Sequence, residues 1–310
     1  MITEGQAAQA LGIGLEATAD STRPARSFWQ ESWGRLRENR VGMASAALVA
    51  VLAVIAVAAP LLSVLVTHHG FQDQDLDHTF APPGAPGHLL GTDDLGHDTL
   101  TRLVWGARVS LTVGLLTVTM SLAVGSTVGL VAGYYGGYLD DVLMRLVDVL
   151  LAIPAVFLFI LVSVLFFRQP NAFTVSVVLA SVGWGGTARL VRAEALTIRG
   201  RDFMLATRSV GAGDVRLIMR HLLPNALPTL VVVASLGVGG VILAEAGLDF
   251  LGFGIHPPTP SWGNMLSNAQ SYFSHSAWLV FLPGTLIFVT VLAFNLLGNA
   301  VRDAFDPRLR

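Results

Sequence analysis

The chain has 310 residues, of which 53% are hydrophobic and 13% are charged, with a formal net charge of −2. Soluble domains carry about 25% charged residues, so this composition predicts a membrane protein. The chain has no cysteine and all 19 basic residues are arginine. These absences exclude disulfides, cysteine metal sites, Schiff-base lysines and a phosphate-binding P-loop, because that loop needs a lysine. Any ATP hydrolysis that drives this chain is therefore expected in another subunit.

The first 40 residues carry charges throughout, which does not fit a cleavable signal peptide. Within residues 27–40, Phe28, Trp29, Trp33 and Leu36 fall on one face of a helix, with arginines around them. This pattern predicts an interfacial helix that lies on the membrane before the first span. The alternative is a disordered tail with incidental tryptophans, which is also the expectation for residues 1–26.

Six segments are long and apolar enough to cross the roughly 30 Å hydrocarbon core as helices. They are Val41–Val66, Val109–Ala132, Val142–Phe167, Ala172–Ala188, Ala226–Leu248 and Trp278–Ala300. Glycines within these spans are expected to let helices approach one another closely. The predicted fold class is therefore all-α, a polytopic membrane protein of six transmembrane helices without a separate soluble domain.

The distribution of arginines predicts how the bundle is oriented in the membrane. Sixteen of the 19 lie in the N-terminal segment, at Arg145, in the loop of residues 189–224 or in the C-terminal tail. Because basic residues favour the cytoplasmic side, both termini and that loop are predicted to be cytoplasmic. The chain then divides into a cytoplasmic segment 1–40, a membrane domain 41–300 with outer loops 67–108 and 249–277, and a cytoplasmic tail 301–310.

The loop of residues 189–224 has the pattern of two short helices joined at a glycine. Asp202–Val210 predicts the first helix, and Gly211 suits its left-handed C-terminal end. Asp214 suits the N-cap of a second helix over Val215–Leu222. Two short helices at an angle would form a rigid knob of the kind that docks into a partner's groove.

The second of these helices is expected to be amphipathic. Val215, Ile218 and Leu222 would share its apolar face, with arginines on another face. Pro224 would stop this helix before the fifth span, because proline breaks the hydrogen-bond ladder of a helix interior.

The same loop resembles the EAA motif of ATP-binding-cassette (ABC) importer permeases, in which E-A-A is followed by three residues, Gly, nine residues, Ile, one residue and Leu-Pro. Ala206, Gly211, Leu223 and Pro224 match at that spacing. The chain departs from the motif at Leu205, Thr207 and His221, and neighbouring Asp202 could replace the missing motif glutamate. The resemblance implies an ATPase-coupling site with these candidate residues: Asp202, Phe203, Leu205, Ala206, Gly211, Asp214, Ile218, Leu223 and Pro224.

Further motifs narrow the resemblance and extend it over nearly the whole chain. The stretch from Leu90 to Asp98, followed by Arg102 and Gly106–Leu111, is similar to the LGTD-x-x-GRD and GAR-x-SL stretches of C-type permeases of dipeptide, oligopeptide and nickel importers. Three further segments match this subfamily: Glu245 with Phe250–Gly254, Pro257–Gly263 and Phe294–Pro307. The departures are His97 for the usual Arg and Asp249 for the usual Ser.

This resemblance implies a type I ABC importer permease fold and no catalytic residue in this chain. The chain would form half of the translocation path of an ATP-driven importer in the bacterial cell membrane, surrounded by lipid. Its implied partners are a second, B-type permease, two cytoplasmic subunits that hold ATP and Mg²⁺, and an extracytoplasmic substrate-binding protein, with no nucleic acid. Di- or oligopeptides are the expected cargo, with nickel, glutathione or another small solute as alternatives.

Several polar residues lie outside the loop motif. Glu245 in the fifth span is a candidate path or gate residue, or else an anchor for the second outer loop. Asp148 is expected to pair with Arg145 or across subunits, with a role in the path as the alternative. The expected outer-loop contacts with partners are Asp93, Asp98, Arg102 and Trp262, the last also suiting an interfacial aromatic belt.

Five of the eight histidines lie in the first outer loop, namely His68, His69, His78, His88 and His97, together with several aspartates. One interpretation is a metal or pH-sensitive site. However, these residues show no regular ligand spacing. We therefore expect a solvated polar loop that contacts the binding protein or the partner permease, and no metal site.

Other function classes lack their motifs. The chain has no H-E-x-x-H or G-x-S-x-G, and no histidine lies in an expected span, which argues against a transmembrane protease. Asp148 and Asp249 flank opposite membrane faces and cannot form an aspartyl pair. No filter-like loop or ring-forming charge pattern indicates a channel. An ATP-independent secondary transporter is a distant alternative, but it would not explain the cytoplasmic knob.

Overall fold

The computed structural model describes residues 28–167 and 170–306, which form helices joined by loops and short turns. The predicted tail 1–26, the last four residues and Arg168 lie outside the described residues. The long helices are α3 (Arg40–Leu62), α4 (Thr99–Tyr135), α7 (Ala172–Arg199), α10 (Leu223–Phe250) and α12 (Trp278–Phe305). The shorter ones are α2 (Phe28–Glu38), α5 (Gly137–Ala152), α6 (Ala155–Phe166), α8 (Asp202–Ser209), α9 (Asp214–Leu217) and α11 (Ala269–His275).

Polar caps explain where three of the long helices begin. Asn39 accepts a hydrogen bond from a first-turn backbone N–H of α3 (2.9 Å), and Asp98 accepts one from the Thr101 N–H of α4 (2.8 Å). Asn171 and Thr174 form a reciprocal capping box at the start of α7. Each cap satisfies a backbone donor that the first helical turn leaves unpaired.

Within residues 28–167 and 170–306, five helical segments are individually long and apolar enough to cross a membrane. The predicted third span, Val142–Phe167, is not one helix: α5 and α6 meet at a bend of 94°, and the number of spans reaches six only if this broken pair crosses once. The bend lies at Ile153, whose backbone is extended (φ −92°, ψ 132°), because Pro154 disfavours helical backbone in the preceding residue. The expectation of a continuous third span was wrong.

The second span is longer than predicted. The helix α4 has 37 residues and begins at Thr99, because Asp98 caps it there. The first outer loop therefore ends at residue 98 instead of 108. Arg102 and Arg108 lie on this helix and not in the loop.

The helices α4 and α7 form the most closely packed pair in the bundle. Three glycines of α4 lie against α7: a Cβ added at Gly125, Gly129 or Gly133 would lie 2.5–2.7 Å from α7 atoms. Any larger side chain would force the two backbones apart. The predicted use of glycine for close helix approach is confirmed at these positions.

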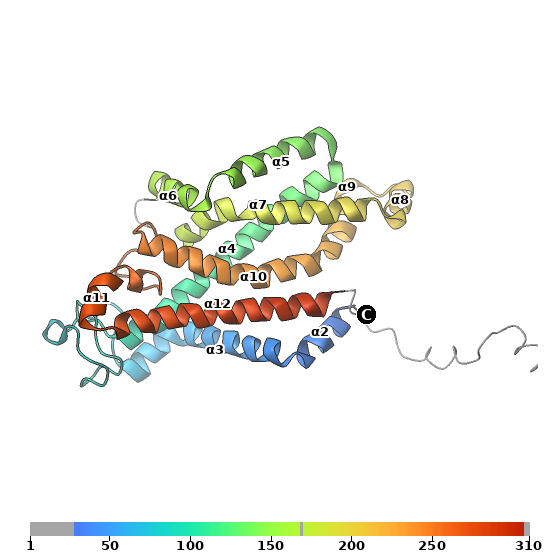
Figure 1. The fold of residues 1–310 in the computed structure, drawn as a ribbon. Helices are drawn as coiled ribbons and strands as arrows, with labels where there is room; N and C mark the ends of the chain where they lie inside the picture. Colours follow the sequence, from blue (N-terminus) through green and yellow to red (C-terminus); the bar gives the residue numbers. More distant parts are fainter. Residues whose placement is uncertain (1–27, 168–169, 307–310) are drawn as a thin grey trace, which may run out of the picture.

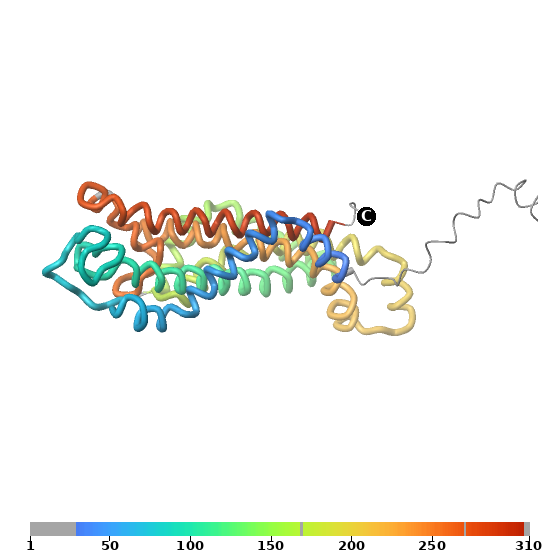
Figure 2. Tube along the Cα trace, turned by 90° about the horizontal axis from the view of Figure 1, so that it is seen from below, coloured from blue at the N-terminus to red at the C-terminus, as the bar shows by residue number. Residues whose placement is uncertain are grey.

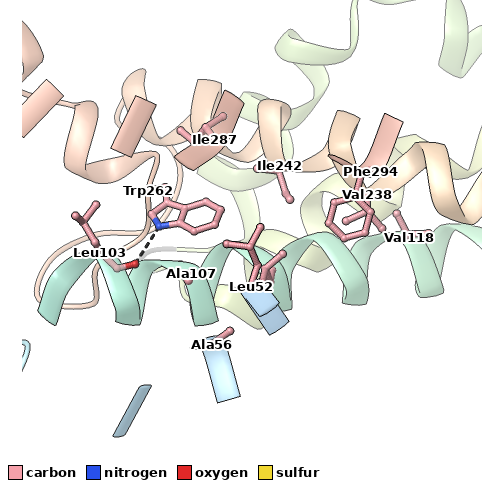
Figure 3. Packing of buried hydrophobic residues seen from close by; sticks show 11 residues of the cluster. Leu52, Ala56, Leu103, Ala107, Val118, Val238, Ile242, Trp262, Ile287 and Phe294 are labelled. Carbon is pink, nitrogen blue, oxygen red and sulfur yellow. Dashed lines mark hydrogen bonds between the residues drawn. The ribbon is translucent and has the colours of Figure 1, made fainter. Parts of the chain in front are cut away.

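The helices α3, α12, α10 and α7 run side by side, α4 crosses them obliquely, and the two ends of the bundle differ (Figure 1). The helices α8 and α9 lie at the end where α12 terminates, whereas α11 and the first outer loop lie at the opposite end (Figures 1 and 2). Near that opposite end, Trp262 is buried in an apolar cluster with Leu103, Ala107, Ile242 and Ile287 (Figure 3). The second outer loop thus contributes to the hydrophobic core.

The structure contains the helix expected within residues 27–40, as α2, which packs against α12. The ring of Trp29 meets that of Phe305 edge-on, with 5.4 Å between ring centres. Trp33 is exposed, and the guanidinium of Arg37 lies 5.2 Å from the centre of its ring. An exposed tryptophan beside arginine suits a helix at the headgroup level, and this position remains a prediction.

Candidate coupling loop and polar sites of the bundle

The loop between α7 and α10 folds into the two short helices that its sequence predicts. The helix α8 spans Asp202–Ser209, one residue shorter than expected, and Gly211 follows with a backbone angle φ of +85°. Residues with a Cβ rarely adopt this left-handed angle, so glycine is favoured where the chain turns between the two helices. The predicted role of Gly211 at the end of the first helix is confirmed.

Buried side chains fix the knob, which we define as residues 202–222, to the bundle. Met204 of α8 and Leu217 and Leu222 of the second helix are almost fully buried, in one cluster with Leu130 of α4 and Ile198 of α7. Burial of a side chain of this size contributes about 1.5–3 kcal/mol. Three such anchors attach the knob to α4 and α7.

A hydrogen bond that the sequence pattern did not reveal adds to these anchors. The hydroxyl of Tyr134 on α4 donates to Asp214 Oδ1 across 2.6 Å. Asp214 was predicted to be the N-cap of the second helix, and this was wrong. Gly213 occupies that position, and Asp214 is the first residue of α9. No local pattern relates Tyr134 to Asp214, because 80 residues separate them.

The second helix of the knob does not stop before the fifth span, which corrects a further prediction. After α9 the chain makes a wider helical turn over Ile218–Leu222 and continues directly into α10. Pro224 falls in the first turn of α10, where helices tolerate a residue without an N–H. The second helix of the knob therefore continues into the fifth span.

The accessible surface of the knob, which we call its outer face, carries apolar side chains. Leu205 is 58% exposed and Val215 is 73% exposed, with exposed Val210 and Met219 on the same knob. Exposed arginines accompany them at positions 201, 208, 216 and 220. Exposed apolar residues with a polar rim mark a protein-interaction surface in many proteins.

The predicted coupling residues fall into two groups, one exposed and one partly buried. Asp202, Phe203, Leu205, Ala206, Gly211 and Pro224 are exposed, whereas Asp214, Ile218 and Leu223 are partly buried. The predicted common face of Val215, Ile218 and Leu222 was wrong, because Val215 is exposed and Leu222 is buried. The widened turn after α9 changes the register that a regular helix would have had.

Glu245 joins three segments at the end of the bundle that carries α11. Its side chain is fully buried, and its Oε2 accepts a hydrogen bond from Ser110 Oγ of α4 (3.2 Å). The same hydroxyl accepts one from the backbone N–H of Trp262 (3.3 Å). The other carboxyl oxygen, Oε1, has no partner among the described residues. This placement supports the anchor interpretation of Glu245.

Asp249 stands where the resemblance leads to an expectation of serine, and it holds the second outer loop against α10. It accepts hydrogen bonds from the N–H of Ile255 (2.5 Å) and the hydroxyl of Ser261. Trp262 follows and is fully buried, with Nε1–H donating to the carbonyl of Leu103 (3.0 Å). Burial of Trp262 contradicts both its expected place in an aromatic belt and its expected partner contact.

Two acids of α5 pair with arginines of α7. Asp148 binds Arg189 and not the expected Arg145, and Asp140 accepts two hydrogen bonds of 2.5 Å from the guanidinium of Arg192. The bidentate pair is the stronger type, whereas the exposed Asp148 pair contributes at most about 1 kcal/mol. Together they hold α5 beside α7.

The other residues that were expected to contact partner proteins interact mainly with groups of this chain. Asp98 caps α4 and lies 3.0 Å from His88 Nδ1, and Arg102 Nε lies 3.6 Å from Asp93. Burial raises the pKa of Asp93, but the hydrogen bond from His97 and the charge of Arg102 lower it below its ordinary value of 3.8. Asp93 and Arg102 also line a cavity of about 340 Å³ between the two outer loops. Contact of these two residues with a partner protein at this cavity remains a prediction.

A second cavity, of about 280 Å³, lies between α4, α6, α7 and α10. Hydroxyl and glycine residues form part of its wall: Thr117, Ser121, Gly183, Thr187, Gly237 and Gly240. None of its described lining residues carries a charged side chain. The wall of this cavity is therefore uncharged and partly polar.

The comparisons with known proteins agree on the family. Residues 125–310 match the family described as binding-protein-dependent transport system inner membrane component, and residues 27–83 match the N-terminal TM domain of oligopeptide transport permease C. The dipeptide transport system permease protein DppC of Bacillus subtilis is 40% identical over 294 residues, 94% of this chain and 90% of that protein. The glutathione transport system permease protein GsiD of Pectobacterium atrosepticum is 37% identical over 288 residues, 93% and 94% of the two chains.

A solved structure agrees on the fold. The MetNI methionine ABC transporter, in inward-facing conformations, contains a chain that aligns with a TM-score of 0.53 at 20% identity, covering 67% of this chain and 97% of that chain. The expected all-α importer permease fold and the resemblance to C-type peptide permeases are confirmed. This chain belongs to the family of binding-protein-dependent transport system inner membrane components, as a multi-pass permease subunit of an ABC importer and not as a catalytic subunit.

Proposed function

We propose that this chain forms half of the translocation path of an ATP-driven importer for di- or oligopeptides, which an extracytoplasmic binding protein delivers. Relatives named as dipeptide transport permeases, at 37–40% identity over most of the chain, support the peptide cargo. The observation that carries the mechanism is the knob, whose inner side is fixed to the bundle and whose outer face is apolar and exposed.

In this proposal, two cytoplasmic partner subunits hold ATP and Mg²⁺, because a chain without lysine has no P-loop of its own. The exposed apolar face of the knob docks into a groove on one of these subunits. The buried anchors then pass the movement of that subunit to α4, α7 and α10. Alternating access results from rigid-body motion of these helices, and this chain holds no cofactor.

The two ends of the bundle take opposite sides of the membrane in the proposal. The end with the knob is cytoplasmic, which the arginine distribution supports, so both termini are cytoplasmic. The end with α11 receives cargo from the binding protein. A second, B-type permease completes the path, and the uncharged cavity between α4, α7 and α10 is the part of this chain that lines it. Glu245 supports the path as an anchor, and Asp148 holds α5 in place.

Substitution on the exposed face of the knob tests the coupling site. Leu205→Asp places a charge where an apolar contact is proposed and should reduce co-purification of the ATP-binding subunits at least tenfold, because one buried leucine contributes about 1.5–3 kcal/mol. Leu89→Asp is the matched control, since Leu89 is 61% exposed but lies in the first outer loop. Equal retention of the ATP-binding subunits by both variants would contradict the docking site.

Reconstitution tests the cargo and the energy source. The assembled transporter in proteoliposomes, with its binding protein outside, should accumulate a labelled dipeptide with ATP and not with ADP. Preference for glutathione would fit the GsiD-like alternative, and preference for nickel would fit the metal alternative. Uptake by this chain alone under a proton gradient would instead support a secondary transporter.

A further inference from the structure

Three metal-binding side chains meet in the first outer loop. His69, His88 and Asp98 each offer one ligand atom, and these atoms all lie within 4.8 Å of one another. The rings of His69 and His88 are stacked, with 4.7 Å between their centres. His88 and Asp98 are almost fully buried, so they are held in place and are not part of a freely solvated loop.

Surrounding groups orient two of these side chains. Asp98 Oδ1 accepts hydrogen bonds of 2.8 Å from both the N–H and the hydroxyl of Thr101. Asp98 Oδ2 lies 3.0 Å from His88 Nδ1, and Asp75 Oδ2 lies 3.7 Å from the other ring nitrogen, Nε2. Metal-binding histidines commonly have a carboxylate beside the ring nitrogen that does not bind the metal. Asp75 lies on that side of His88 but beyond hydrogen-bond length, and its Oδ2 is 2.8 Å from His78 Nδ1.

We propose that His69, His88 and Asp98 bind a divalent transition-metal ion of the zinc type. Two imidazoles and one carboxylate form a donor set that suits Zn²⁺, whose fourth position water can fill. Zinc would replace the proton between His88 Nδ1 and Asp98 Oδ2, and bonds of about 2.0–2.2 Å place ligand atoms roughly 3.4 Å apart. The three segments therefore need to shift by about 1 Å to close the site.

The ion would join three parts of the outer loop. His69 follows the end of the first span, His88 lies near the middle of the loop, and Asp98 is the cap of α4. Zinc would thus fix the long connection between the first and second spans. Because metal binding stabilises the folded state that contains the site, the ion should raise thermal stability. The sequence offered a metal site in this loop only as one interpretation, and its irregular ligand spacing did not single out these three residues.

Zinc titration of the full-length chain in lipid nanodiscs, stripped with chelator and without a polyhistidine tag, tests the proposal. We expect one Zn²⁺ per chain in equilibrium dialysis and a rise in Tm on addition of ZnCl₂. His69→Asn and His88→Ala should each weaken Zn²⁺ binding at least tenfold and remove the rise in Tm. His68→Asn is the matched control, because exposed His68 has a φ of +57° that asparagine tolerates.

Three results would overturn the proposal. The first is the absence of stoichiometric Zn²⁺ binding to the unmodified chain, and the second is Zn²⁺ binding that none of the cluster variants changes. The third is loss of binding in His78→Ala alone, which would place the ion at the exposed pair of His78 and Asp75. Since His88→Ala leaves Asp98 without its buried partner and can impair folding, half-buried His69 provides the deciding variant, with the metal-free Tm as the check on its folding.

Discussion

Tyr134 and Asp214 connect the second span to the knob: the phenol donates to the carboxylate across 2.6 Å, between the last turn of α4 and the first residue of α9. Asp214 is partly buried, whereas Leu205 and Val215 of the same knob are exposed. In the proposed coupling mechanism, α4 is therefore connected to the knob by a short polar contact as well as by the buried leucines.

Tyr134→Phe removes this hydrogen bond and keeps the ring. A hydrogen bond to a charged group contributes about 1.5–3 kcal/mol, so local opening of the knob should become at least tenfold more frequent. Hydrogen exchange of the amides in residues 202–222 measures the change. Co-purification of the ATP-binding subunits should persist, because the exposed face is untouched. Unchanged exchange rates would show that the bond contributes little to the stability of the knob.

Gly211→Ala and Gly213→Ala form a matched pair within one turn. Neither added Cβ would meet another atom within 4 Å, but φ is +85° at Gly211 and −71° at Gly213. Gly211→Ala should therefore destabilise the knob by about 1–2 kcal/mol, whereas Gly213→Ala should be neutral or slightly stabilising. Hydrogen exchange of the knob and ATP-dependent uptake by the assembled transporter are the measurements. Equal effects of the two changes would argue against a strained turn.

Glu245→Gln distinguishes an anchor from a gate. Glutamine has the same volume and keeps an oxygen that can accept from Ser110, so an anchor role predicts near-normal folding and transport. Ser110→Val removes the hydroxyl that binds both Glu245 and Trp262 and should cost about 1–3 kcal/mol through the unsatisfied buried groups. Thermal stability and uptake are measured together. Loss of uptake in Glu245→Gln at normal Tm would assign Glu245 to gating.

The outer loop should show a pH dependence set by Asp93. Its pKa is lowered in the folded chain, so the carboxylate stabilises the fold above the ordinary pKa of 3.8, and this contribution is lost as pH falls through the lowered pKa. Asp93→Asn should therefore lower Tm at pH 7. The difference from the unmodified chain should shrink steadily below pH 3.8. A Tm difference that stays constant with pH would point to packing instead of charge.

Local patterns predicted much of this protein. The spans follow from runs of apolar residues, α8 and its glycine end from helix signals within ten residues, and the family from motifs in order along the chain. The bend at Ile153–Pro154 had a local signal as well, the proline itself. It was missed because hydrophobicity summed over a whole span does not register one backbone angle.

Contacts between distant segments could not be predicted in the same way. Asp148 was expected to pair with Arg145 or across subunits, but it pairs with Arg189 of α7. Trp262 has the composition of an interface residue, and only the fold of its loop onto α4 and α10 buries it. Hydrogen-bond partners that lie 80 or 159 residues apart produce no periodic pattern in the amino-acid sequence.

The amino-acid sequence by itself determined the class of protein, the order of its helices and the presence of the knob, because these depend on the solvent preference and backbone preference of neighbouring residues. Tertiary structure decided which side of the knob is free, which acids are anchors, and that two histidines meet Asp98. Those outcomes depend on how far apart segments lie after the helices have packed, which is set by the sum of many side-chain contacts and not by any single stretch.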